Sequence, residues 1–107
     1  MPHLYLLIQY NDFKKSDAAF YLNIKIVFVD HSELHAREYV DENHRKYTFH
    51  WQDPDGKLIS RWDNAPHFRE LATFPHHKHL SLALAVDSYD ISLNEVMAFI
   101  LRQIQKV

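Results

Sequence analysis

The chain has 107 residues, and its 12 lysines and arginines are nearly balanced by 14 aspartates and glutamates, which argues against a general nucleic-acid binder. The length suits one domain with a modest core, and a hydrophobic content of 47% excludes a disordered chain. The lack of cysteine excludes a disulfide scaffold, a thiolate nucleophile and a Cys-type zinc site. Because no membrane span or signal peptide is evident, we expect a cytoplasmic protein with no membrane partner.

The first half of the chain predicts a series of antiparallel strands. Residues 20–29 place apolar side chains at every second position, from Phe20 to Phe28, which is typical of a half-buried strand. A second strand is predicted at 33–40, and a third at 44–52, where aromatic and polar residues alternate. The Asp-Pro-Asp-Gly sequence at 53–56 predicts a hairpin turn, because proline fixes φ and glycine allows a positive φ. A fourth strand then returns at 57–63.

The segments on either side of these strands are less regular. Residues 4–10 fit a strand or a helix, and we interpret them as a strand. Pro66 and Pro75 oppose continued strand pairing, so we predict an ordered loop over 65–78. A short strand is expected at 80–86.

The C-terminus predicts a helix. Ser92 and Glu95 form a capping box, in which each side chain bonds the backbone of the other residue. The apolar residues at helical spacing are Leu93, Val96, Met97, Ile100, Ile104 and Val107. The predicted fold is therefore α+β: a single two-layer domain over residues 1–107, with an antiparallel β-meander of four to six strands and the helix packed on one face.

Basic side chains and histidines concentrate in the middle of the chain. Residues 1–43 carry four basic and seven acidic side chains, whereas residues 44–79 carry six basic and four acidic ones together with six histidines. Four of these histidines lie between positions 61 and 79. Imidazole has a pKa near neutrality, so such a cluster suits proton transfer, metal binding or phosphate contact.

One reading of the histidine cluster is a metal site. His77 and His79 are two residues apart, so on an extended segment both point to the same side. His67 is a possible third ligand and Asp63 a fourth, and the metal would be zinc or another transition metal. The alternative is structural: the histidines bond loop carbonyls and hold an irregular segment in one shape.

A second reading is a cationic strip on the polar face of the sheet. The alternation places Arg37, Lys46 and Arg61 on polar faces of three strands, with His50 beside them. If those faces coincide, the strip can hold a phosphodiester while histidine supplies acid and base. The alternative is a solvated outer face without function.

Two polar residues stand out at particular positions. Glu38 falls on the apolar side of its strand, where it would have a raised pKa, pair with Arg61 or Arg69, or lie at an exposed edge. Asn64 follows the fourth strand, and we predict that its side chain bonds the backbone.

The order of these motifs resembles the TumE-type toxins of type II toxin–antitoxin modules. The similar segments are VDHSELHAREYVD at 29–41, KYTFHWQDPDGKLISRWDNAPH at 46–67 and ELATFPHHKH at 70–79, followed by the C-terminal helix. The resemblance covers residues 20–106 and leaves 1–19 unmatched.

The resemblance implies a toxin that arrests growth and is neutralised by a helix-turn-helix antitoxin encoded nearby. It further implies metal-independent cleavage of RNA, with Glu38 and either His77 or His79 exchanging protons and Arg61 bracing the phosphate. The expected catalytic residues are Glu38, Arg61, Asp63, His67, His77 and His79. The expected substrate-binding residues are Arg37, Lys46, His50 and Lys78. The chain departs from its relatives at Phe68 and Arg69, where they often have a histidine and a proline.

Two other hypotheses remain open. The chain would be a metal-dependent enzyme or metal-binding module if His67, His77 and His79 hold a transition metal, although no cofactor is our first expectation. It would be a non-catalytic toxin if it blocks its target by binding. Residues 1–19 are expected to offer a sheet edge to a partner's strand or to a second copy in a homodimer.

Overall fold

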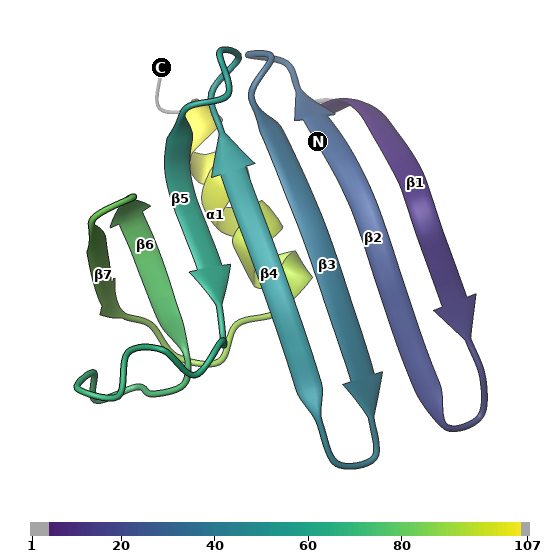
Figure 1. Ribbon diagram of the computed structural model, residues 1–107. Coiled ribbons are helices and arrows are strands. Elements are labelled where there is room, and N and C mark those ends of the chain that lie inside the picture. The colour runs from purple at the N-terminus through teal and green to yellow at the C-terminus, as the bar shows by residue number, and fades with distance from the viewer. Residues whose placement is uncertain (1–4, 106–107) are drawn as a thin grey trace.

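The computed structural model, which describes residues 5–105, shows one antiparallel sheet with a single helix against one of its faces (Figure 1). The elements are β1 (Tyr5–Lys15), β2 (Ala19–Phe28), β3 (Glu33–Asp41), β4 (Arg45–Gln52), β5 (Leu58–Asp63), β6 (His77–Ser81), β7 (Leu84–Asp87) and α1 (Leu93–Gln105). Every strand pairs antiparallel with the next one along the chain, so the sheet is an uninterrupted meander. The predicted α+β architecture is confirmed.

The predicted strand count was wrong: the sheet has seven strands, not four to six. The segment predicted as one strand at 80–86 belongs to a hairpin, in which Ser81 pairs with Leu84. Apart from Ser81 the run is apolar, and it has neither glycine nor proline, so its turn signal is weak. The loop ends at residue 76, so His77 and Lys78, which we had assigned to it, begin β6. Two further predictions, strand residue Leu4 and helix residue Val107, lie outside the described residues.

The core lies between the sheet and α1. The inward residues of β2 follow the predicted alternation, and Phe28, Phe49 and Leu34 are completely buried. From the helix, Val96 and Ile100 are also completely buried. A capping box at Ser92 and Glu95 begins this helix, as predicted. The two layers therefore pack through the alternation of the strands and the apolar stripe of the helix.

The opposite side of the sheet has no helix against it, and we call it the open face (Figure 1). Side chains there come from the strand positions that alternate with the core, including His35, His50 and Arg61. The loop at 64–76 connects β5 to β6 at one end of the sheet. Within residues 5–105, no helix is both long and apolar enough to cross a membrane.

Candidate active site on the open face

Two rows of side chains cross the open face, with one residue from each of four neighbouring strands. The Arg61 row consists of His35, His50, Arg61 and His79. The Asp63 row consists of Arg37, Thr48, Asp63 and His77. Members of a row are direct cross-strand partners, which point to the same face with Cβ atoms about 4.5–5.5 Å apart. The register of the meander thus gathers residues from positions 35 to 79 into one surface.

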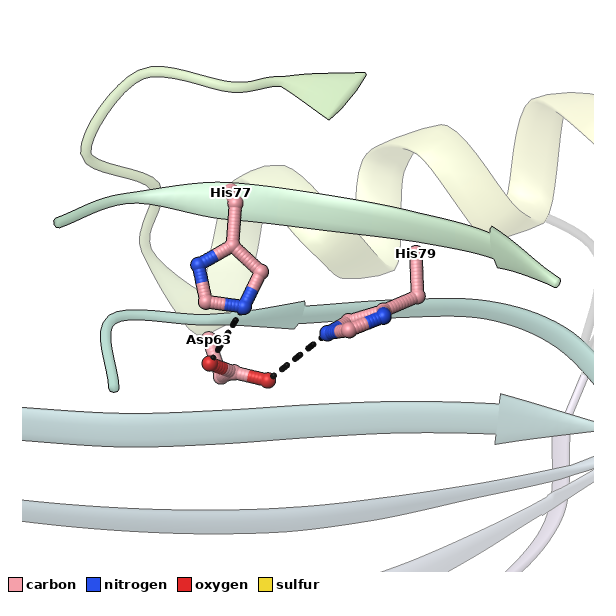
Figure 2. Close-up of side chains that lie close together, drawn as sticks. All are labelled: Asp63, His77 and His79. Carbon is pink, nitrogen blue, oxygen red and sulfur yellow. Dashed lines mark ion pairs between the residues drawn. The ribbon is translucent and has the colours of Figure 1, made fainter. Parts of the chain in front are cut away.

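Asp63 is the centre of this surface (Figure 2). Its Oδ1 lies 2.9 Å from His77 Nε2 and accepts a hydrogen bond of 3.0 Å from the Ala65 amide. Its Oδ2 lies 3.5 Å from His79 Nε2 and accepts a hydrogen bond of 3.2 Å from Arg61 Nε. The Asp63 side chain is 7% exposed, so these contacts are largely shielded from water. One carboxylate therefore positions two imidazoles and one guanidinium.

His77 is buried and fixed from both sides. Its Nδ1 lies 2.9 Å from the Pro75 carbonyl oxygen, which can only accept, so Nδ1 carries a proton. Its Nε2 is buried and has no partner with hydrogen-bond geometry, although Asp63 Oδ1 is only 2.9 Å away. With 1% of its side chain exposed, His77 is a positioning residue within this cluster and does not reach the solvent.

His79 and His50 lie on either side of Arg61 and have perturbed protonation. Burial lowers the pKa of His79, with His77 and Arg61 lowering it further, while the charge of Asp63 opposes the shift. Burial also lowers the pKa of His50, and the charges of Arg61 and His35 act in the same direction. Both imidazoles are therefore biased toward the neutral form that accepts a proton.

All members of the two rows except His35 and Arg37 line a cleft of about 610 Å³. The predicted site residues that line it are Lys46, His50, Arg61, Asp63, His67, His77 and His79. Arg37 lies beside it, in a smaller hollow of about 310 Å³ that shares His50 and Arg61. The cleft residues that sequence reasoning did not assign to the site are Thr48, Leu58, Ala65, Phe68 and Leu82. Of these, only Thr48 carried a signal, its position between Lys46 and His50 on the polar face.

Phe68 forms a wall of the cleft. Its ring centroid lies 4.7 Å from that of His77 and 5.5 Å from that of His79. The family resemblance implies a different residue at position 68, and here the aromatic ring of Phe68 packs against the two histidines. The loop at 64–76 therefore orients the imidazoles through Phe68 as well as through the Pro75 carbonyl.

Lys78, which the sequence predicted as a substrate-binding residue, does not line the cleft. Its Nζ lies 4.9 Å from the Trp62 ring centroid and 4.3 Å from that of Phe99, on the helix side of the sheet. Burial lowers the pKa of this amine. The alternation of β6 explains the placement, because a residue between His77 and His79 must point to the opposite face.

Glu38 also lies on the helix side of the sheet, like its cross-strand partner Tyr47. Of the alternatives left open for Glu38, the structure shows pairing with a cation: its carboxylate accepts a hydrogen bond of 2.8 Å from Arg45 Nε, in place of Arg61 or Arg69. Arg45 also binds Asp90 and donates a 2.7 Å hydrogen bond to the Ile91 carbonyl oxygen. Glu38 thus helps anchor the segment before α1, and the structure places it on the opposite side of the sheet from His77 and His79, with which it was expected to exchange protons.

Asn64 bonds the backbone, as predicted, but its partners lie in β4 and not in the loop where we expected them. Its side-chain Oδ1 accepts a 3.0 Å hydrogen bond from the Tyr47 amide, and its Nδ2 donates a 2.6 Å bond to the Arg45 carbonyl oxygen. The side chain thereby continues the pairing of β4 just beyond the end of β5. This contact fixes the point at which the chain leaves the sheet, directly after Asp63.

Among the described residues, one group could hold a metal ion: Asp63, His77 and His79, whose ligand atoms all lie within 4.8 Å of one another. Three of the four ligands considered from the sequence form this group, whereas His67 is exposed on the loop and does not join it.

The chain was compared with known proteins at the level of families, curated proteins and solved structures. A family model described as Toxin TumE matches residues 2–106, so it includes almost all of the N-terminal segment that the sequence resemblance had left unmatched. No curated protein and no solved structure matches the chain. The family match spans more than half of the 107 residues, and the chain belongs to the TumE toxin family.

Proposed function

We propose that this toxin arrests growth by cleaving RNA in the cleft on the open face, without a metal, and that His79 and His50 carry the protons. The observation that supports this most directly is the Arg61 row. Arg61 pairs with His50 on β4 and with His79 on β6, so a guanidinium lies between two imidazoles on one surface. A phosphodiester bound to Arg61 would have a proton acceptor on one side and a proton donor on the other.

The proposed reaction is transfer of the phosphoryl group to the neighbouring 2′-oxygen. Neutral His79 removes the proton of the ribose 2′-hydroxyl, and that oxygen attacks phosphorus. The bond from phosphorus to the 5′-oxygen breaks, and this oxygen takes a proton from protonated His50. The products are a 2′,3′-cyclic phosphate and a free 5′-hydroxyl. Arg61 and Lys46 stabilise the added negative charge of the transition state.

The assignment of base and acid follows from the surroundings of each ring. Asp63 Oδ2 lies 3.5 Å from His79 Nε2, so the proton that His79 gains is stabilised by a carboxylate. The groups whose charge perturbs the pKa of His50 are Arg61 and His35, and both lower it. Its imidazolium therefore releases a proton readily once the anionic phosphate has favoured its formation.

The family membership also supports an antitoxin partner, which we propose to be a helix-turn-helix protein encoded nearby.

We further propose that two copies of this chain pair through β1. This 11-residue strand has no neighbour on its outer edge among residues 5–105, and Leu6, Tyr10 and Phe13 are 57%, 67% and 52% exposed. A strand related to itself by a two-fold axis can extend the sheet by antiparallel pairing. In analytical ultracentrifugation, the wild type should sediment as a dimer and Leu7→Lys as a monomer. A monomeric wild type would contradict the dimer and leave the antitoxin as the proposed partner of this edge.

The test of cleavage compares the wild type with His79→Gln and with His67→Gln, a second cleft histidine outside the Arg61 row. RNA incubated with the purified wild type in EDTA should acquire 2′,3′-cyclic phosphate ends, whereas an oligonucleotide with a 2′-deoxy residue at the cleaved position should stay intact. His79→Gln should lose roughly 10²–10⁴-fold in rate, and His67→Gln should lose far less. Growth arrest that survives in His79→Gln, with no new RNA ends, would instead favour a toxin that blocks its target by binding.

A further inference from the structure

We infer that Asp63, His77 and His79 form a binding site for zinc, and that zinc in this site switches off the proposed RNA cleavage. The proposal that zinc binds depends only on the geometry of the three side chains. The inhibitory consequence rests on the proposed function, because it requires His79 to act as the base.

The three side chains converge on one point from adjacent strands (Figure 2). Asp63 comes from the end of β5, and His77 and His79 come from β6 with the spacing that puts both rings on the same face. Their ligand atoms lie within 4.8 Å of one another. Tetrahedral zinc with bonds of 2.0–2.2 Å separates its ligands by about 3.4 Å, so small rotations of the side chains bring all three into range.

The strongest support comes from His77. Its Nδ1 donates to the Pro75 carbonyl oxygen at 2.9 Å, so Nε2 is the ring nitrogen that faces Asp63. That Nε2 is buried without a hydrogen-bond partner and lies 2.9 Å from a carboxylate oxygen. The ring nitrogen and the carboxylate oxygen meet without hydrogen-bond geometry, and a metal ion beside them would bind both atoms. A backbone carbonyl behind the other ring nitrogen is also the arrangement that orients histidine ligands in metal sites.

The donor set selects the metal. Two imidazoles and one carboxylate, with no thiolate in the chain, suit zinc and its close analogues better than calcium or magnesium, which prefer oxygen ligands. With three protein ligands, the fourth position of a tetrahedral ion stays open. Because Asp63, His77 and His79 all line the cleft, that position can take a water molecule from it.

Zinc would remove the groups that the proposed cleavage needs. With the metal on one ring nitrogen of His79, the other nitrogen holds the ring proton at neutral pH, so the ring cannot accept the proton of a 2′-hydroxyl. Asp63 would at the same time be engaged by the metal and withdrawn from Arg61. The metal-bound form should therefore be folded and inactive.

The binding step is tested by calorimetric titration of the EDTA-treated, dialysed full-length protein with zinc chloride, and by cobalt(II) absorption as a report of tetrahedral geometry. We expect one zinc per chain at micromolar affinity or tighter, and an intense visible cobalt band. His77→Gln should weaken binding at least tenfold, whereas His67→Gln should leave it unchanged. Since His77 is buried and its variant could fail to fold, His79→Gln provides a second, partly exposed ligand variant with the same expected loss. Equal binding by the wild type and both ligand variants, or none at all, overturns the site.

The inhibitory step is tested by cleavage of RNA by the wild type at rising zinc occupancy, with EDTA to reverse it. We expect the rate to fall in proportion to the fraction of protein bound to zinc. Cleavage that is unaffected by full occupancy, or that requires zinc, overturns the switch. If no form cleaves RNA, the proposed function fails and the switch fails with it, but the calorimetric result still decides the metal site.

Discussion

Asp63 and His77 are direct cross-strand partners, and their side chains meet with Asp63 Oδ1 2.9 Å from His77 Nε2. Both are buried on a face of the sheet that no helix covers, which is unusual for a carboxylate and an imidazole. The pair is enclosed because the loop at 64–76 returns over it and places Phe68 against the His77 ring. Asp63 in turn contacts Arg61 and His79, so this buried pair sets the geometry of the Arg61 row.

The first prediction follows from this relationship. In Asp63→Asn the side chain keeps its size but loses the charge that stabilises protonated His79. We expect the rate of RNA cleavage to fall by roughly 100-fold or more, with the melting temperature changed by only a few degrees. The measurement is single-turnover cleavage beside a thermal melt. An Asp63→Asn protein that cleaves at the wild-type rate would show that the carboxylate has no part in the chemistry.

The second prediction separates Glu38 from the site. Glu38→Gln removes the ion pair with Arg45 Nε, in which the two side chains are 17% and 25% exposed. We expect a loss of about 1–2 kcal/mol in the free energy of unfolding, since a partly exposed charged hydrogen bond is worth about that much. The cleavage rate of the folded protein should be unchanged, because the sheet lies between Glu38 and the cleft. Urea unfolding and cleavage below the unfolding transition measure the two effects separately.

The third prediction concerns pH. The pKa values of His50 and His79 are lowered in the folded protein, so below the unfolded value of about 6.5 the unfolded chain binds more protons than the fold does. The free energy of unfolding should therefore fall as pH drops from about 7 through the two lowered pKa values. Each histidine contributes at most about 1.4 kcal/mol per pH unit to the slope. Replacing both by glutamine should flatten the dependence, and an equally steep curve in the double variant would assign it to other groups.

The sequence could predict the architecture because its signals were local. Alternation at 20–29 and 44–52, the turn at 53–56 and the capping box at Ser92 each act over a few residues, and each was confirmed. The hairpin at 77–87 was missed because its turn, near Leu82, carries no glycine or proline. The pairing of β6 with β7 fixes this turn, and turns without glycine or proline are difficult to predict from the sequence.

The composition of the site was only partly predictable, for a related reason. Period-two alternation places Arg61, Asp63, His77 and His79 on one face, and the register confirms this placement. The same rule, applied to β6, would have removed Lys78 from the site. Glu38 could not be placed in this way, because its partner Arg45 acts together with Asp90, whose position depends on the segment between β7 and α1. Contacts between distant segments therefore determine that Glu38 pairs with Arg45, whereas Asp63 lines the cleft.

The fourth prediction uses Lys78, the residue whose sequence position suggested substrate binding. Its Nζ lies against the rings of Trp62 and Phe99, and among the described residues it forms no ion pair. Lys78→Met keeps the length of the side chain and removes a charge that burial disfavours. We expect RNA affinity and cleavage to stay within about twofold of the wild type, because the amine is on the far side of the sheet from the cleft.

Lys46→Met, the matched variant on the open face, should weaken RNA binding and reduce its dependence on salt, since Lys46 lines the cleft. Fluorescence anisotropy with a labelled RNA at two salt concentrations compares the two variants, and a larger loss for Lys78→Met would place the RNA on the helix side of the sheet.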